Sequence, residues 1–494
     1  MPPAGGELVL SLTQPDPTSN RSTGRGRRVP VALLAALAGL LLGVAPPLQA
    51  QGFGIYEQGT CVMGRGGAAA ATPCLDGSSM FFNPAGLAEV DRITASAGVT
   101  GIRPFGSFTS DRTGEETDLV EKTIPVPHGY GAAPLGDRVT AGLGVYAPYG
   151  LETEWPADGE EAFDGRFLGY DNSLQTVYVQ PTAAVHLTDR LSVGGGPLLA
   201  LGRVELNQRL DLSSQPVPGT ELTFGQLGVP FHTGFADANL DADWSTGFGA
   251  NIGLRYEPTE RISLGARYLT PVEIDYSGDA TFEQVSTGLV LPDNNPLGLP
   301  GGTSVDALLQ QEGVFDEGGP LADQGVQTSI TMPGQLVVGA AVRPLPRLEL
   351  EADWVYTQWA AFDTVRLEFG QQQTPDDVQV ENYDDTHGVH AGLEYSATDR
   401  IDVRAGYFWN EPASPDAVVT PLLPEGERTQ GTVGIGWEAT PRLQFDVAYQ
   451  FLYQLDRRGR TVDPPEGSAP TEDLNNGLYS FAAHLFAATA TVRW

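Results

Sequence analysis

A short turn recurs along the chain, and the segments beside it alternate between apolar and polar residues. Each turn ends in arginine followed by a branched apolar residue. After the last turn, Leu443, Phe445 and Val447 interleave with Gln444 and Asp446. Alternation of period two bounded by turn residues is typical of β-hairpins, so each strand has one apolar and one polar face. The six turns are residues 136–139, 188–191, 259–262, 345–348, 398–401 and 440–443.

We predict an all-β protein, a 14-stranded antiparallel transmembrane β-barrel whose apolar strand faces contact lipid. The strands are longer than the five or six residues usual in soluble proteins, and long enough to cross a bilayer when tilted. Short turns alternate with long connections, as in outer-membrane barrels. In a soluble sandwich, the alternative, the apolar faces would meet in a core. The predicted strands are 93–103, 125–133, 138–149, 173–187, 190–207, 244–257, 261–272, 328–343, 347–369, 386–397, 400–411, 427–439, 442–455 and 481–494.

Tryptophans near the predicted strand ends suit two interfacial girdles. Trp437 and Trp494 fall near the short-turn rim, and Trp244, Trp359 and Trp409 fall toward the other rim. The last strand alternates to an aromatic C-terminus, which resembles the signal by which outer-membrane barrels are recognised for insertion. The barrel-assembly machinery is therefore an expected partner.

The N-terminus has the pattern of a secretory signal peptide. Arginines at 25, 27 and 28 precede an apolar run over 31–45, and the small residue Ala50 ends the stretch. The run is shorter than the roughly 20 residues that a spanning helix needs. We therefore predict a signal peptide over 1–50, with an atypical N-terminal extension. Export to an oxidising compartment makes Cys61 and Cys74 a disulfide candidate, with a pair of free thiols as the alternative.

Residues 51–90 are rich in glycine and alanine and have neither strand nor helix period. They end in the turn signal Asn83, Pro84, Ala85 and Gly86. Because the stretch lies between an export signal and a predicted barrel over 91–494, we expect it to fold inside the lumen as a hatch.

The longest connections are predicted over 208–243 and 273–327, with a short helix over 304–311. Both are apolar enough to argue against disorder, and an exposed apolar patch on a cell surface is typical of a capture site. The candidate capture residues are Phe224, Phe231, Phe235, Leu291 and Leu299.

The formal net charge of −34 argues against nucleic acid as a partner, because phosphate binding favours basic patches. Solvated loops explain the acidity most simply; adaptation to high salt, or divalent cations bridging to anionic surface lipid such as lipopolysaccharide, are alternatives. We find no nucleotide, metalloprotease or nucleophile motif. The sequence thus predicts no catalytic residues, metal or cofactor.

Several short segments stand out along the chain: GFGIYEQ, GRGGAAA and FFNPAG in the predicted hatch, and GLGVYAPYGLETEW, ITMPGQLVVGAA and RAGYFWNEPASP in the barrel. In this order they resemble the FadL/TodX (OMPP1) family of outer-membrane transporters for long-chain fatty acids and other hydrophobic compounds. The resemblance implies ligand-gated passive uptake by a monomer in the outer membrane of a Gram-negative-type bacterium. Ligand would be captured between the two long loops, pass to an internal site and leave where the third strand kinks.

The resemblance places that kink near Pro148, Tyr149 and Gly150, where proline and glycine weaken a ladder; an ordinary strand end is the alternative. A fatty-acid carboxylate needs a cation in a dehydrated site, and the candidates are Arg203, Arg209 and Arg267. An aromatic or aliphatic hydrocarbon would need none. Three other functions stay open, namely a surface adhesin or structural barrel, a histidine-dependent outer-membrane hydrolase and a hydrophilic porin.

Overall fold

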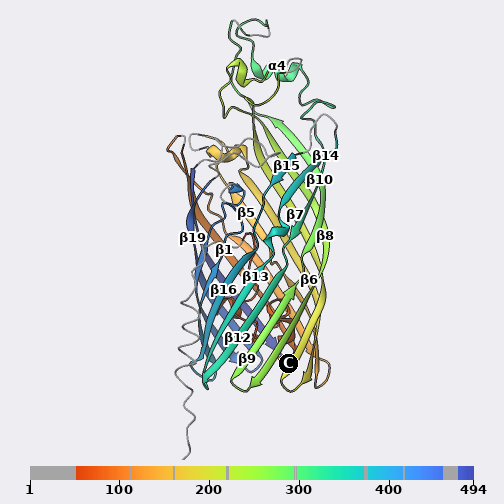
Figure 1. The fold of residues 1–494 in the computed structure, drawn as a ribbon, viewed down its shortest axis with the longest axis vertical. Coiled ribbons are helices and arrows are strands. Elements are labelled where there is room, and N and C mark those ends of the chain that lie inside the picture. The colour runs from red at the N-terminus through yellow and green to blue at the C-terminus, as the bar shows by residue number, and fades with distance from the viewer. Residues whose placement is uncertain are drawn as a thin grey trace, which may run out of the picture. The chain divides into compact units, whose positions relative to one another are not determined.

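The computed structural model describes residues 52–111, 113–159, 162–217, 222–293, 295, 298–371, 377–415, 418–459 and 477–494. The predicted signal peptide over 1–50 lies outside the described residues. The strands form a closed antiparallel barrel (Figure 1) with 14 strand positions in its wall, as predicted. Each position, called a stave below, holds either one strand or two strands in line. Antiparallel pairing of β1 with β20, from Thr94 opposite Arg493 to Ser110 opposite Gly477, closes it.

Ten staves are single strands, and four are interrupted. The single strands are β1 (Thr94–Ser110), β3 (Ile124–Pro134), β6 (Asp171–Thr188), β7 (Leu191–Asp211), β8 (Gly234–Thr259), β16 (Thr386–Ser396), β17 (Ile401–Asn410), β18 (Arg428–Thr440), β19 (Leu443–Arg458) and β20 (Gly477–Arg493). The interrupted staves are β4 (Val139–Tyr146) with β5 (Gly150–Glu154), β9 (Ile262–Leu269) with β10 (Val272–Gln284), β12 (Gln335–Leu345) with β11 (Gln324–Met332), and β13 (Leu348–Thr357) with β14 (Thr364–Phe369). Two short strands, β2 (Glu116–Asp118) and β15 (Asp377–Val380), pair antiparallel with β1 and β14 respectively.

The period-two pattern orients the side chains as expected. On β19, Phe445, Val447 and Phe451 are exposed on the outer face, whereas Asp446 and Gln450 are buried in the lumen. Trp244, Trp437 and Trp494 are also exposed. No helix among the described residues is long and apolar enough to cross a membrane.

Two predictions about this wall were wrong. Trp359 is not in a girdle, because it is fully buried against Phe53 of the hatch, with ring centroids 4.7 Å apart. The loops predicted over 208–243 and 273–327 are shorter, because β7, β8, β10 and β11 run into them. On β10 the outward residues Glu273, Asp275 and Asp279 are exposed acids, whereas Ile274 and Tyr276 are buried, so the apolar face of this part of the wall points inward instead of outward.

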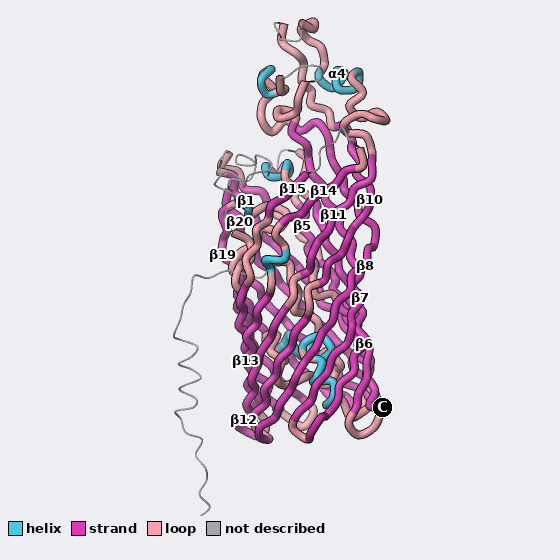
Figure 2. Tube along the Cα trace, turned by 45° about the vertical axis from the view of Figure 1, so that its right-hand side comes forward, coloured by secondary structure: helices cyan, strands magenta, loops and turns pink. Residues whose placement is uncertain are grey.

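The hatch segment folds into three short helices inside the lumen (Figure 2). These are α2 (Thr60–Gly64), α3 (Ser79–Phe82) and the 3₁₀ helix η1 (Pro84–Glu89). The predicted turn begins η1, where the Asn83 side chain accepts a hydrogen bond from the Ala85 amide at 3.1 Å. Phe81 and Leu87 are fully buried in the largest hydrophobic cluster, together with the wall residues Tyr146 and Met332.

The two long loops, 212–233 and 285–323, pack on each other beyond the strand ends, and together they are called the loop head below. The predicted helix is present as α4 (Val305–Gln311), capped by the Ser304 hydroxyl, and it stands at the far end of this loop head (Figure 1). Three further 3₁₀ turns lie in connections: η2 (Asp164–Phe167), η3 (Gly225–Leu227) and η4 (Trp359–Ala361).

Candidate functional site

The third stave of the barrel is broken where a kink was predicted. β4 pairs with β3 as far as Val145 opposite Gly129, and ends at Tyr146. The stave resumes as β5 at Gly150, which pairs with Gln175 of β6. No pairing between β5 and β3 occurs among the described residues, so the wall has a gap between these two strands.

The hatch occupies the free edge of the broken stave. The Ile55 amide donates to the Pro148 carbonyl at 2.8 Å, and the Gly150 amide donates to the Phe53 carbonyl at 3.0 Å. The Gln58 side chain accepts from the Ala147 amide at 2.9 Å and donates to the Ala147 carbonyl at 2.6 Å. Hatch residues therefore provide the hydrogen bonds that a neighbouring strand would supply.

A cavity of about 450 Å³ lies beside this gap. Lumen-facing residues line it, among them Val126 and Leu174, which are 4% and 7% exposed. Outward-facing residues line it as well, including Pro127 and Trp244. The cavity therefore runs from the lumen through the wall toward the lipid-facing side.

Few polar groups face the cavity, and Arg428 is the one cation among its described lining residues. Arg428 donates to Gln454 Oε1 at 3.4 Å, and no carboxylate of the described chain lies within ion-pair distance of it. Glu57 of the hatch also lines the cavity and accepts from Gln450 at 2.6 Å. Burial raises the pKa of Glu57, although the Gln450 hydrogen bond and the field of Arg428 oppose the shift.

None of the three predicted carboxylate partners lines this cavity. Arg203 lies on the outer face of β7 and pairs with Asp241 at 2.9 Å. Arg209 pairs with Asp237 at 2.6 Å and with Asp158 at 3.1 Å. Both arginines are thus already neutralised by acids of the strand ends and loops.

The third candidate, Arg267, faces the lumen as its strand position requires. It is 1% exposed, lies 4.4 Å from the centre of the Phe81 ring, and donates to Gln335 at 3.1 Å. This cation supports the hatch. Arg428, the cation in the cavity, was not among the carboxylate partners predicted from the sequence. The alternation of β18 could have identified it, because Arg428, Gln430 and Thr432 stand at alternate positions on the face that points into the lumen.

The predicted capture residues form a small core in the loop head. Phe224 and Phe235 are 1% and 2% exposed, and Leu291 is also buried. Leu299 packs against this cluster, and Phe231 is exposed. The apolar side chains of the two loops bury one another. The open apolar patch expected from the sequence is therefore reduced to Phe231 and a few neighbours.

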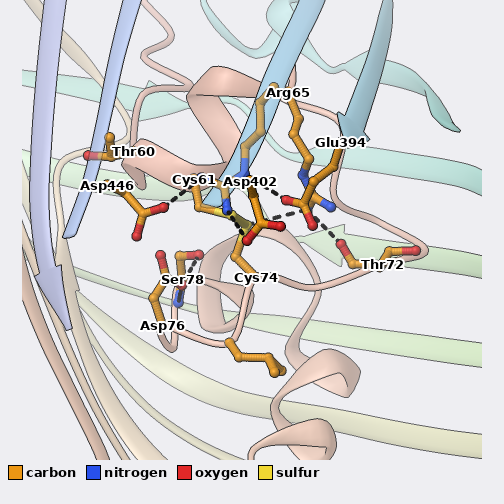
Figure 3. Close-up of a disulfide and its surroundings, with 12 residues drawn as sticks. Thr60, Cys61, Arg65, Thr72, Cys74, Asp76, Ser78, Glu394, Asp402 and Asp446 are labelled. Atoms are coloured by element: carbon orange, nitrogen blue, oxygen red, sulfur yellow. Dashed lines mark hydrogen bonds and ion pairs between the residues drawn. A yellow bond between two sulfur atoms is a disulfide. The ribbon is translucent and has the colours of Figure 1, made fainter. Parts of the chain in front are cut away.

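A disulfide joins Cys61 to Cys74 within the hatch (Figure 3). Beside it, Arg65 donates to the Thr72 carbonyl at 2.8 Å and pairs with Glu349 of β13 at 3.3 Å. The bridge and Arg65 thus tie both ends of the 61–74 loop to each other and to the wall.

Two buried acids of β13 hold the same loop by its backbone. Asp353 Oδ2 accepts from the amides of Ala69 and Ala70 at 2.9 and 3.0 Å. Glu351 Oε1 accepts from the next two amides, at 2.7 and 3.1 Å. The polar lumen face of the wall therefore satisfies backbone donors that neither helix nor strand satisfies.

Wall glycines let the hatch approach closely. A β-carbon at Gly265 would overlap the Ala70 carbonyl, and one at Gly253 would overlap the Asn83 side chain. A β-carbon at Gly406 would meet the hatch backbone at Gly66. The absence of side chains at these glycines thus leaves room for the hatch against the lumen face of the wall.

One serine–histidine pair lies within hydrogen-bond distance on the barrel wall. Ser192 Oγ lies 2.9 Å from His186 Nδ1, but the other ring nitrogen lies 2.9 Å from the Ala88 carbonyl, so no acid orients this histidine. No cluster of potential metal ligands occurs among the described residues.

Comparisons with known proteins agree with one another. The family model "Outer membrane protein transport protein (OMPP1/FadL/TodX)" matches residues 41–494. A long-chain fatty acid transport protein of Escherichia coli O6:H1 is 25% identical over 438 residues, covering 85% of this chain and 90% of its own. A Pseudomonas aeruginosa FadL homologue superposes with a TM-score of 0.73 at 20% identity, covering 90% of this chain and 99% of its own. The Pseudomonas putida toluene transporter TodX has a TM-score of 0.64 at 18% identity, with coverage of 90% and 99%.

Proposed function

Because this chain belongs to the OMPP1/FadL/TodX family of outer-membrane transport proteins, we propose that it carries long-chain fatty acids or similar hydrophobic molecules across the outer membrane by passive diffusion. The chain is an outer-membrane β-barrel of a transporter family. The observation that carries the finer proposal is the cavity between lumen and lipid at the gap between β3 and β5.

The proposed route starts at the loop head and ends in the lipid. Phe231 makes the first contact at the surface, and the ligand passes between the two loops into the lumen. It then enters the cavity above the hatch, because hatch residues from Gly52 to Glu57 form part of the cavity lining. Exit through the gap releases the ligand directly among lipid chains, so an apolar molecule never has to cross the polar lumen below. The hatch blocks that lower route.

The cavity suits a long apolar chain with one anionic group. Its volume lies within the usual range for small-molecule sites, and Leu174, Leu452 and Phe481 contribute apolar surface. A carboxylate placed beside Arg428 would form a charge-assisted hydrogen bond away from bulk water, the strong kind. We therefore assign the carboxylate-binding role to Arg428 rather than to Arg203, Arg209 or Arg267.

A neutral hydrocarbon is the second candidate ligand, as in the toluene transporter named above. Binding of a fluorescent fatty acid and of an uncharged alkyl fluorophore to purified protein separates the two. We expect R428Q to weaken fatty-acid binding about tenfold, the scale of a lost charged hydrogen bond, with little effect on the uncharged probe. The control R203Q removes an arginine outside the cavity and should change neither. Saturable binding of the uncharged probe alone would favour a hydrocarbon, and no binding of either probe would contradict the transport proposal.

The proposal also separates this protein from an adhesin and from an open porin. A porin would show high ion conductance when intact, whereas a lumen closed by the hatch conducts little. Mass spectrometry of lipid that co-purifies with the protein would identify the natural ligand. Recognition of β20 by the barrel-assembly machinery, contact with lipopolysaccharide and a monomeric state stay predictions.

A further inference from the structure

We infer that the gap between β3 and β5 is a permanent slot, kept open because neither of its edges can pair with the other. The inference rests on the proposed function only in treating the gap as the exit route. An unpaired strand edge is costly inside a membrane, because no water is present to satisfy its backbone groups. The gap therefore needs a chemical reason to persist, and each edge supplies one.

The β3 edge lacks donors because Pro125 and Pro127 stand at alternate positions. In an antiparallel strand, alternate residues direct their backbone groups to the same neighbour. The ladder between β3 and β1 runs without interruption from Thr94 opposite Ala132 to Ile102 opposite Ile124. Two prolines facing β1 would remove donors from that ladder, so their missing N–H positions face the gap.

The ladder on the other side of β3 supports this assignment. Pairing of β3 with β4 begins at the turn and ends at Gly129 opposite Val145. The next two residues of β3 that direct their backbone groups to this side, Pro127 and Pro125, have no amide hydrogen. The ladder therefore stops where the donors stop. Proline at an edge is a common way to prevent a strand from pairing further.

At the break itself, from Ala147 to Gly150, backbone groups of the opposite edge are already bonded to the hatch. The Ala147 amide and carbonyl both bond to the Gln58 side chain, at 2.9 and 2.6 Å. The Pro148 carbonyl and the Gly150 amide bond to Ile55 and Phe53. Gln58 is fully buried, so its side-chain amide acts as a fixed substitute for one strand residue. The structure thus assigns to Pro125, Pro127 and Gln58 the role of positioning residues that keep the slot open.

The variant P125V/P127V/Q58A tests this inference, because it restores two donors and frees Ala147. We expect fluorescent fatty-acid uptake by cells to fall at least tenfold. P344V, the same exchange near the turn end of β12, should leave uptake unchanged. A folded triple variant, judged by heat-modifiable migration and an intact Cys61–Cys74 bridge, that transports at the parental rate would overturn the inference.

A labelling experiment reports on the slot without relying on transport. V126C introduces one thiol in the cavity, and a maleimide dissolved in the lipid phase should label it rapidly in the parent and at least tenfold more slowly in the triple variant. No labelling of the parent would overturn the open slot. Slower labelling with unchanged uptake would support the slot inference while contradicting the exit route of the proposed function. If the triple variant does not fold, amide exchange in the parent decides: rapid exchange at Ala147 and Gly150 would contradict the edge bonds to the hatch.

Discussion

Three charged side chains are among the described residues that line the cavity, and one of them, Glu152, is already paired with Lys122 at 2.8 Å. Arg428 faces the cavity from β18, and Glu57 faces it from the hatch. Because burial raises the pKa of Glu57, this carboxyl loses its proton at a higher pH than an ordinary glutamate. Below that pH Glu57 is neutral and does not oppose the attraction of an anion to Arg428; above it, the charges of Glu57 and Arg428 oppose each other.

This arrangement predicts a pH dependence for anionic ligands. An alkyl sulfonate keeps its charge throughout, so its affinity should fall as the pH rises through the titration of Glu57, above the ordinary value of 4.5. We expect a decrease of about three- to tenfold, since one pKa unit corresponds to a factor of ten. Calorimetric titration at several pH values measures it. E57Q should bind tightly with a flat profile, and an equally steep profile in that variant would exclude Glu57 as the titrating group.

Gly265 of the wall lies directly against the hatch backbone at Ala70, and the hatch needs the space left by its missing side chain. In G265A the added β-carbon would overlap the Ala70 carbonyl, and the backbone on both sides has little freedom to move. We expect the hatch to shift away from the wall and the ion conductance of single channels in planar bilayers to rise. G431A is the matched control, because a β-carbon at Gly431 meets nothing within 4 Å. Equal conductance in the two variants would show that the close approach is unimportant.

At the level of elements, the barrel strands could be predicted and the contacts inside the barrel could not. Period-two alternation located all 14 staves, because lipid on one face and hatch or water on the other impose it on every strand that crosses the membrane. The outer parts of β8, β10 and β11 were missed where the outward face becomes polar and the apolar residues, such as Ile274, Tyr276 and Val326, are buried. Trp359 was misplaced because an aromatic residue near a strand end serves a girdle or a core equally well.

The hatch anchors depend on pairs of residues far apart in the sequence. Asp353 and Glu351 lie some 280 positions from the amides they accept, and no local pattern identifies such a pair. The same limit applies to the cavity: parity could place Arg428 in the lumen, but only the break in the third stave shows which lumen residues surround the gap. The family resemblance placed that break, and Pro148 and Gly150 supported it without excluding an ordinary strand end.

The disulfide predicts a separable stability of the hatch. Closing a loop with a sequence separation of 13 stabilises a folded segment by about 3 kcal/mol. Since Cys61 and Cys74 take no part in the wall ladder, we expect C61A/C74A to loosen the hatch without unfolding the barrel. Limited proteolysis should cut the hatch of the variant faster, while heat-modifiable migration of the barrel stays unchanged. Parallel loss of both would mean that hatch and wall unfold together.

For the whole molecule, we propose that the hatch is the part that closes the lumen. Deletion of residues 52–85 should leave a barrel that inserts and conducts ions strongly, because the polar lumen face, including Glu351 and Asp353, would then border water. Planar-bilayer recordings test this, with the full-length protein as reference. High conductance of the full-length protein itself would contradict the idea that the hatch is a plug.

The edge of the third stave also has a consequence for the order of assembly. A barrel that takes hydrogen bonds for its wall from its own N-terminal segment cannot complete that wall before this segment has entered the lumen. The edge of the third stave is thus expected to be completed only when the hatch segment has taken its place. Pulse-labelled hydrogen exchange during refolding should accordingly show the Gly150 amide gaining protection later than the amides of β19 and β20, and simultaneous protection would contradict this order.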